Sequence, residues 1–261
     1  MVNKMKAKKK FGQNFLIDNN IIFKISESIA AKENDLIIEI GPGMGALTKS
    51  LQEKNAQILA YEIDTDMIPY LNKISNNKTK VIYKDILEAN IEEDIKEFKY
   101  NKLFVVGNLP YYITTPIIKH LIKENIPCDE MVFMVQEEVA DRYTANPNTK
   151  DYSSITLYLK YYFDLEKLFK VSKKCFNPVP KVESAIIRLK RRENVPRVDK
   201  ERYFKLIEDS FRMKRKTLKN NLNGYDMEKI NNILEKNNLS SQVRAEEIEE
   251  KVFIEIAESL E

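Results

Sequence analysis

The chain of 261 residues has few cysteines and histidines and no long apolar run. Its two cysteines, Cys128 and Cys175, are too few for a disulfide framework or a zinc site, and the single histidine, His120, has no Cys or acidic partners that would make a metal site. No apolar stretch approaches the length of a membrane-spanning helix, and no apolar segment follows the basic N-terminus as in a secretory signal. We therefore expect a cytoplasmic protein with no metal and no membrane partner.

Basic residues are concentrated in two blocks, although the whole chain has a net charge of only +3. Residues 1–16 contain five lysines and no acid, and residues 188–219 contain thirteen basic and five acidic residues. Two such blocks on an otherwise acidic body predict a polyanionic partner, with solvated surface lysines as the alternative for either block alone. The candidate contacts to that partner are Lys8, Lys9, Lys10, Arg212, Arg215 and Lys216.

The most informative stretch of the sequence is residues 103–112. Residues 103–106 form a short apolar run that predicts a buried strand, and the turn that follows is rich in amide, proline and aromatic groups. Open α/β sheets place their chemistry at the carboxyl ends of strands, so this turn lies where a site is expected.

The turn suits an exocyclic amine of a nucleobase, which is a poor nucleophile because its lone pair is delocalised into the ring. The side-chain carbonyl of Asn108 and the backbone carbonyl of Leu109, held outward by Pro110, would accept from both N–H bonds and free that lone pair. Tyr111 offers a flat face for stacking a base that has left its helix. The alternative is an ordinary strand followed by an Asn/Pro turn with two packed tyrosines.

A strand, a glycine-rich loop and a helix follow one another at residues 36–54. This order predicts a nucleotide-binding turn in which Gly41 lies close to the ligand, because glycine lets a ligand approach the backbone. Glu62 ends the next strand, 21 residues after Gly41, where a doubly wound fold places the acid that binds ribose hydroxyls. Gly41, Gly43 and Ala46 also fit the dinucleotide fingerprint, so an NAD-linked oxidoreductase is the alternative. The amide turn described above argues against it.

Two further residues are weaker candidates for binding. Asp85 follows a third strand and could accept a hydrogen bond from an adenine amine, although aspartate is also a common turn residue. Phe176 precedes a loop stiffened by Pro178 and Pro180, which could hold its ring against the second face of an everted base. Ordinary packing is the alternative for Phe176.

The order of the expected elements predicts an α/β fold of two domains. A charged linker at residues 190–200 leads to a pattern that is helical only, including a basic amphipathic stretch at residues 211–222. We therefore expect a Rossmann-like domain over residues 1–190 and a small C-terminal all-α domain over residues 191–261. Before the linker, strands and helices alternate as in a doubly wound parallel sheet, with strands at residues 36–40, 57–61, 80–83, 103–106 and 131–135.

These stretches, taken in order, resemble the bacterial small-subunit (16S) ribosomal RNA adenine N6,N6-dimethyltransferases. The similarity covers nearly the whole chain, and although each motif alone is weak, eight in register are specific. The matching segments are residues 13–16, 39–48, 62–64, 85–87, 108–113, 134–136, 176–184 and 215–220.

The resemblance implies a methyltransferase fold with S-adenosylmethionine as the methyl donor. It also implies a role for each cofactor-binding position. Asn14 and Leu16 would close over the cofactor, and Gly41 would lie beneath it. Glu62 would hold the ribose, and Asp85 would hold the adenine amine of the cofactor.

The resemblance also assigns the reaction. Asn108 would border both cofactor and target, Leu109 would present its carbonyl, and Tyr111 and Phe176 would enclose the target adenine. The implied activity is dimethylation of two adjacent adenines near the 3′ end of small-subunit ribosomal RNA, a step in ribosome biogenesis. The partner would be that RNA or the immature small subunit, bound in part by the C-terminal domain, and we expect a monomer.

Two alternatives share these motifs. One is a large-subunit adenine methyltransferase of the macrolide-resistance type, against which Leu109, residues 114–116 and the basic residues 215–217 argue. The other is a mainly non-catalytic ribosome assembly factor, against which the complete cofactor and Asn108 motifs argue. Glu137 departs from the lysine expected at its position and puts a local RNA contact in doubt.

Overall fold

A computed structural model describes residues 13–260, which form two compact units. The first unit extends to Glu137 and resumes from Glu166 to Lys190. The second contains Glu138–Leu165 and the chain from Arg191 onward. Within residues 13–260, no helix combines the length and the apolar character needed to cross a membrane.

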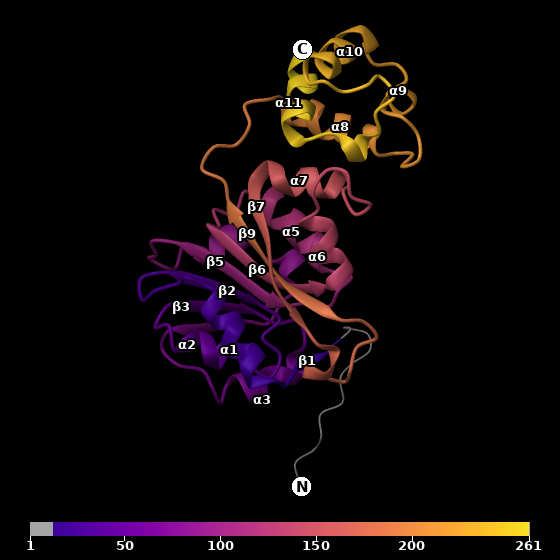
Figure 1. Ribbon diagram of the computed structural model, residues 1–261. Coiled ribbons are helices and arrows are strands. Elements are labelled where there is room, and N and C mark those ends of the chain that lie inside the picture. Colours follow the sequence, from indigo (N-terminus) through magenta and orange to yellow (C-terminus); the bar gives the residue numbers. More distant parts are fainter. Residues whose placement is uncertain (1–12, 261) are drawn as a thin grey trace. The chain divides into compact units, whose positions relative to one another are not determined.

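The first unit is built on a sheet with the strand order β4-β3-β2-β5-β6-β9-β7 (Figure 1). The strands β2 to β6 run parallel, and β9 pairs with β6 in the antiparallel direction. Strand order proceeds one way from β2 and the other way from β5, so the crevice between these two strands is the switch point where ligands bind in such sheets. The strands are β2 (Leu36–Ile40), β3 (Gln57–Tyr61), β4 (Thr79–Ile82), β5 (Leu103–Asn108), β6 (Glu130–Gln136), β7 (Phe163–Val171) and β9 (Ser184–Arg191).

Helices cover both faces of this sheet. The helix α2 (Ala46–Gln52) connects β2 to β3, and α5 (Thr114–Lys123) connects β5 to β6. Because these crossovers proceed in opposite directions, the right-handed rule for parallel strands places α2 and α5 on opposite faces. The β2 strand is accordingly buried along its whole length. On one face, α1 (Asn19–Ser28) and α2 pack against a core that includes Ile37 and Val106.

The remaining elements of the first unit are short. The carboxylate of Asp18 caps α1 by accepting from the N–H groups of Asn20 and Ile21. Outside the main sheet, β1 (Phe15–Leu16) pairs with β8 (Phe176–Asn177), which joins two segments far apart in the sequence. The others are η2 (Thr65–Met67), α3 (Ile68–Leu71), η3 (Ile86–Glu88), α4 (Ile91–Ile95) and η4 (Lys173–Cys175).

The second unit is all-helical apart from the strand ends that enter it, and its core is rich in tyrosine. The rings of Tyr161 and Tyr203 lie 5.4 Å apart, and both side chains are buried with Tyr152 and Phe253 in one cluster. Its helices are α6 (Glu137–Tyr143), which begins at the last residue of the first unit, α7 (Ser154–Tyr162), α8 (Lys200–Ser210), α9 (Leu218–Asn221), α10 (Met227–Lys236), η5 (Ala245–Glu247) and α11 (Glu250–Ser259).

The structure confirms the α/β class and the expected strands, with bounds that differ by at most a few residues. The helix expected at residues 211–222 is wrong for most of its length, because residues 211–217 form turns and only α9 is helical. Side chains at both ends of α9 bond to main-chain groups that a longer helix would pair with each other. The Thr217 hydroxyl accepts from the Asn220 N–H, and the Asn221 amide bonds to the main chain of Met213.

Residues 138–165 pack with the C-terminal helices, which the sequence did not suggest. Leu157 and Tyr161 of α7 share a buried cluster with Tyr203 and Phe253. The second compact unit is therefore larger than residues 191–261 alone. The division of the chain at residue 190 into a catalytic and an RNA-binding domain stays a prediction.

The tyrosine core yields a matched pair of stability tests. The Tyr203 hydroxyl is buried without a hydrogen-bond partner among residues 13–260, whereas the Tyr161 hydroxyl donates to the Pro196 carbonyl at 3.0 Å. Removing an unsatisfied buried group relieves its desolvation cost, so Tyr203→Phe is expected to leave the free energy of unfolding unchanged or higher, while Tyr161→Phe loses about 1 kcal/mol. Urea denaturation of both variants measures the difference. Equal losses would contradict the assignment.

Candidate active site

The two stretches singled out in the sequence meet at the carboxyl ends of β2 and β5. The register pairs Ile40 with Gly107, so the glycine loop and the Asn108 turn leave the sheet at the same level. Gly107 makes this approach possible, because a Cβ there would lie 2.9 Å from the Ile40 carbonyl oxygen and 3.0 Å from Leu109 Cγ. The sheet therefore sets the spacing between the two halves of the site.

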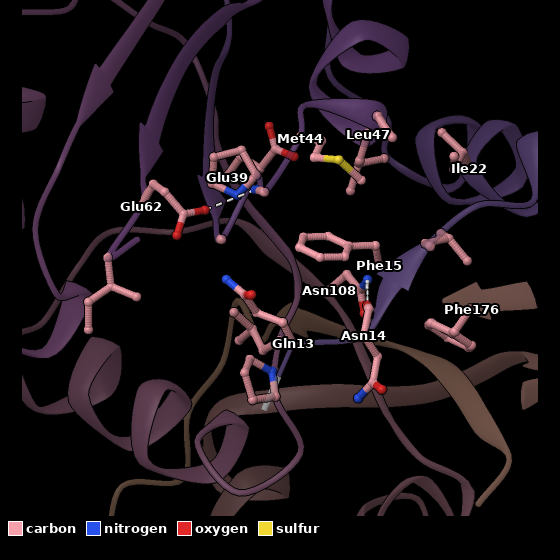
Figure 2. Close-up of a pocket in the computed structure, with 18 of the residues that line it drawn as sticks. Gln13, Asn14, Phe15, Ile22, Glu39, Met44, Leu47, Glu62, Asn108 and Phe176 are labelled. Carbon is pink, nitrogen blue, oxygen red and sulfur yellow. Dashed lines mark hydrogen bonds between the residues drawn. The ribbon is translucent and has the colours of Figure 1, made fainter. Parts of the chain in front are cut away.

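A pocket lies at this edge of the sheet (Figure 2). It brings together eight of the residues predicted from the sequence, contributed by the N-terminal segment, the glycine loop, the end of β3, the Asn108 turn and β8. These eight are Asn14, Leu16, Gly41, Glu62, Asn108, Leu109, Tyr111 and Phe176.

The glycine loop adopts a backbone that other residues rarely adopt. Gly41, Gly43 and Gly45 have φ angles of +70°, +55° and +80°. A Cβ at Gly45 would also lie 2.0 Å from Ile74 Cδ1, and one at Gly43 would lie 3.3 Å from the Phe15 ring. Glycine is thus required for the course of this loop and for the close approach of the N-terminal segment.

Glu62 joins the glycine loop to the end of β3. Its Oε2 accepts from the Gly43 N–H at 2.9 Å and its Oε1 from the Asp64 N–H at 2.8 Å, and Figure 2 shows the first of these bonds. Burial raises the pKa of Glu62, while these backbone N–H groups lower it. Since a carboxylate offers about four lone-pair sites, roughly two remain for a ligand in the pocket.

Glu39 is a functional candidate that the sequence argument did not single out. It lines the pocket, is only 1% exposed, and its Oε2 has no hydrogen-bond partner among residues 13–260. Burial raises its pKa to about 7; the charge of Glu62 adds to this shift, and the Thr48 hydroxyl opposes it without reaching hydrogen-bonding geometry. The available signal was an acid inside an apolar strand, Leu-Ile-Ile-Glu-Ile, because a buried carboxylate requires a partner.

The N-terminal segment closes one side of the pocket. Gln13 Nε2 donates to Asp64 Oδ2 at 2.8 Å, and β1 is fixed to β8 by main-chain pairing. The Asn14 carbonyl accepts from Asn108 Nδ2 at 3.4 Å, as Figure 2 shows. Because a carbonyl can only accept, this bond turns the amide nitrogen of Asn108 toward Asn14 and leaves Oδ1 available to accept from a ligand.

The two tyrosines after Pro110 have different surroundings. The Tyr111 hydroxyl is hydrogen-bonded to the Ser184 Oγ at 2.8 Å, and burial raises its pKa, so the phenol stays neutral. Tyr112 is 65% exposed, so the alternative of two packed tyrosines does not hold. Phe176 lines the pocket but is only 2% exposed, which restricts any contact of its ring with a ligand to the pocket side.

A model of the family described as ribosomal RNA adenine dimethylase matches residues 4–261 of the chain. The chain belongs to that family. Membership confirms the resemblance inferred from the motifs, and the family implies a methyltransferase reaction that depends on S-adenosylmethionine.

Relatives of the family agree in sequence and fold. The chain is 43% identical to the ribosomal RNA small subunit methyltransferase A of Streptococcus gordonii, over 97% of this chain and 91% of that protein. It is 46% identical to the protein of the same name from Listeria monocytogenes, over 82% of this chain and 75% of that protein. Among solved structures it is similar to a dimethyladenosine transferase from Plasmodium falciparum, with a TM-score of 0.77, 25% identity and coverage of 93% and 95%. It is also similar to the 23S rRNA methyltransferase ErmE, with a TM-score of 0.75, 26% identity and coverage of 95% and 99%.

The family fold is therefore the Rossmann-like methyltransferase fold expected from the sequence, followed by C-terminal helices. The 23S rRNA methyltransferase shares this fold with a chain whose sequence relatives are named small-subunit methyltransferases, so the fold does not distinguish between these two substrates. Nothing in the comparisons favours an NAD-linked oxidoreductase.

The structure does not bring every predicted residue to the pocket. Asp85 is not among the lining residues; its Oδ1 accepts from the Leu87 N–H at 3.0 Å and caps η3, so its role in binding adenine stays a prediction. Glu137 forms ion pairs with Lys170 and, at 3.3 Å, with Lys167. Arg212, Arg215 and Lys216 are exposed on the second unit, and Lys8, Lys9 and Lys10 lie outside the described residues.

The raised pKa of Glu39 predicts a pH dependence of stability in the absence of ligands. Between the unfolded value of 4.5 and the folded value of about 7, the folded chain holds a proton that the unfolded chain has lost, so the free energy of unfolding falls as pH rises through this window. Glu39→Gln removes this term. The difference in the free energy of unfolding between the variant and the unmodified chain is therefore expected to shift in favour of the variant by up to about 3 kcal/mol from pH 5 to pH 8.

Urea unfolding at the two pH values measures this gain, with Glu53→Gln, at an exposed position, as the control. The same pH dependence in Glu39→Gln and in the control would show that Glu39 is ionised in the folded chain.

Proposed function

We propose that the chain transfers methyl groups from S-adenosylmethionine to N6 of two adjacent adenines near the 3′ end of small-subunit ribosomal RNA, and so contributes to ribosome biogenesis. The observation that carries the proposal is the Asn108 turn beside the glycine loop, in the same pocket. Relatives over 40% identical along nearly the whole chain carry the name of small-subunit methyltransferases. The proposed setting is a monomer in the cytoplasm.

The pocket fits the cofactor in its donor set. The glycine loop gives backbone access, and Glu62 keeps lone pairs for ribose hydroxyls. The Oε2 of Glu39, which has no hydrogen-bond partner in the described part of the chain, suits a cationic group. Asn14 and Leu16 would enclose it from the N-terminal side, and Asp85 would bind its adenine amine. Bound there, S-adenosylmethionine supplies a methyl group that its sulfonium has already activated.

The residues of the turn would activate the target. Asn108 Oδ1 and the Leu109 carbonyl accept from the two N–H bonds of the adenine amine and draw it toward tetrahedral geometry, which frees its lone pair for in-line attack. Tyr111 is held by Ser184 so that its ring is fixed, and Phe176 would face the other side of the base. A general base is not required, because the protonated adenine amine is acidic enough to lose its proton to water.

The RNA would be bound through positive charge. Arg212, Arg215 and Lys216 lie on exposed turns of the second unit, and Lys8, Lys9 and Lys10 belong to the basic N-terminal block. Contacts of this kind bind phosphates without reading sequence, so the choice of adenine would rest with the pocket and with the fold of the RNA.

The decisive experiment follows methyl groups from labelled S-adenosylmethionine into undermethylated small ribosomal subunits, with large-subunit RNA in parallel. Label recovered from small subunits as N6,N6-dimethyladenine is the expected result. Label only in large-subunit RNA would assign the activity to the resistance-type relatives. No label in either, with RNA binding intact, would favour an assembly factor.

The role of Asn108 can be separated from cofactor binding. Asn108→Ala removes one of the two acceptors for the amine but none of the groups beneath the cofactor, so turnover is expected to fall about a hundredfold or more while cofactor binding stays measurable. Single-turnover methyl transfer and calorimetric titration of the cofactor measure the two effects. Asn72→Ala, an exposed amide of the same unit, is the control. Near-normal turnover would show that Asn108 does not polarise the amine.

A further inference from the structure

Residues 211–217, called the basic loop below, carry four cations on a backbone that is not helical. Arg212, Lys214, Arg215 and Lys216 are all exposed, and Met213 is 45% exposed among them. Like charges this close repel one another, and an untethered loop would spread over many conformations, each of which must be given up when a partner binds. The structure shows how this loop is held.

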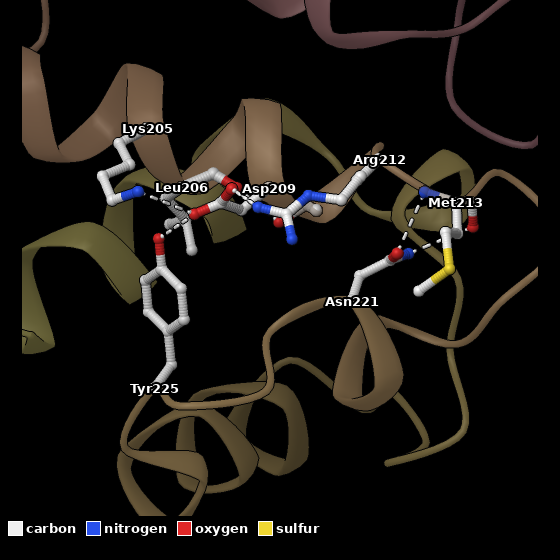
Figure 3. A network of polar contacts seen from close by, with 8 residues as sticks. Lys205, Leu206, Asp209, Arg212, Met213, Asn221 and Tyr225 are labelled. Atoms are coloured by element: carbon white, nitrogen blue, oxygen red, sulfur yellow. Dashed lines mark hydrogen bonds and ion pairs between the residues drawn. The ribbon is translucent and has the colours of Figure 1, made fainter.

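One anchor of the basic loop is the side chain of Asn221, which is only 7% exposed. Its Oδ1 accepts from the Met213 N–H at 3.0 Å and its Nδ2 donates to the Met213 carbonyl at 3.2 Å (Figure 3). The amide therefore satisfies both main-chain groups of a single residue, which fixes that residue in position and orientation. The Lys216 N–H donates to the same carbonyl at 2.9 Å and closes the turn.

The second anchor is Asp209, near the end of α8. Arg212 Nη2 donates to its Oδ1 at 2.7 Å, and the Tyr225 hydroxyl donates to its Oδ2 at 2.7 Å, as Figure 3 shows. Lys205 completes the network at 3.2 Å. The hydrogen bond from Tyr225, followed by those from Lys205 and Arg212, lowers the pKa of Asp209, so the anchor is ionised at neutral pH.

These contacts sort the cations of the basic loop into two groups. Arg212 is bound to Asp209, and Lys214 donates to the Lys150 carbonyl. Within residues 13–260, the structure gives no ion-pair or hydrogen-bond partner to the side chains of Arg215 and Lys216. The charges left for an external anion are thus those of Arg215 and Lys216, which follow the two anchored residues, Arg212 and Met213, in the chain.

We propose that Asn221 and Asp209 are positioning residues that hold the basic loop so that Arg215 and Lys216 meet the phosphate backbone of a folded RNA in a fixed arrangement. The inference rests on the proposed function, since it presumes an RNA substrate, and adds residues that do not themselves touch RNA. Asn221 is uncharged and Asp209 is anionic. Neither can attract phosphate by its own charge, so any favourable contribution of either to RNA affinity must act through the geometry of the loop.

Asp209→Asn separates two explanations, because they predict opposite changes in RNA affinity. Asp209→Asn is nearly isosteric but removes a negative charge beside the basic loop. If only net charge mattered, the variant would bind undermethylated small subunits more tightly. If the loop must be held, it binds them more weakly, and we expect about a threefold to tenfold loss of affinity.

Asn221→Ala gives the second test, in the full-length chain. We expect about a tenfold loss of affinity for undermethylated small subunits, a salt dependence shallower by about one to two phosphate contacts, and a raised KM for subunits with kcat unchanged. Asn237→Ala is the matched control. Within residues 13–260, the Asn237 side chain donates in the same unit to the Ile233 carbonyl and to Glu255, and it forms no hydrogen bond with the basic loop.

A double-mutant cycle completes the design. Arg215→Ala with Lys216→Ala should cost less affinity in the Asn221→Ala background than in the unmodified chain, because the loop no longer presents these charges. Additive losses of affinity in this cycle would overturn the inference. A lowered Tm of Asn221→Ala with RNA affinity retained would also overturn it, because Asn221 would then have a purely structural role. Tighter RNA binding by Asp209→Asn would overturn it as well.

The failure of the proposed function would have a different signature. If Arg215→Ala with Lys216→Ala leaves RNA affinity unchanged, the loop is not an RNA contact and the inference falls, although methyl transfer by the unmodified chain is unaffected. If the unmodified chain transfers no label, the catalytic assignment fails, whatever the loop variants bind.

Discussion

The site depends on the register between two parallel strands. Ile40 of β2 lies opposite Gly107 of β5, and the absence of a side chain at Gly107 lets the strand ends approach more closely than any larger residue would allow. Leu109, which follows, packs under Gly41, since a Cβ there would lie 3.7 Å from Leu109 Cδ2. The glycine loop and the Asn108 turn are thus in direct contact. A shift of either strand would move both, so the sheet sets the distance between the proposed cofactor loop and the turn proposed to bind the target base.

Much of this arrangement could be predicted because it is local in sequence. Apolar runs of about five residues predicted the parallel strands, and acids and amides placed just after them predicted Glu62 and Asn108. What could not be predicted depends on residues far apart in the chain. The bond from Gln13 to Asp64 and the pairing of β1 with β8 leave no periodic signal in the sequence. The burial that raises the pKa of Glu39 follows only from the packing of the sheet.

The basic loop shows a different limit. In the longer stretch of residues 211–222, Phe211, Leu218 and Leu222 recur at helical spacing, yet the Asn221 side chain binds the main chain of Met213 and a turn forms before α9. The pattern of apolar residues indicates whether a segment prefers a helix. It does not reveal that a side chain elsewhere, such as that of Asn221, will form hydrogen bonds with the backbone of the segment and so prevent the helix. The same holds for residues 138–165, whose place in the second unit is decided by a shared core of tyrosines that no local pattern reveals.

The pairing of β1 with β8 couples two sides of the pocket. It is made by main-chain groups of two residues on each strand, with one further bond from the Ile17 N–H to the Cys175 carbonyl. β1 carries Phe15, whose ring lies beside Gly43 of the glycine loop, and β8 carries Phe176, which lines the pocket. Any movement of β1 away from the glycine loop would therefore also remove the main-chain partner of Phe176. The pocket cannot open on its N-terminal side while the Phe176 side keeps its full support.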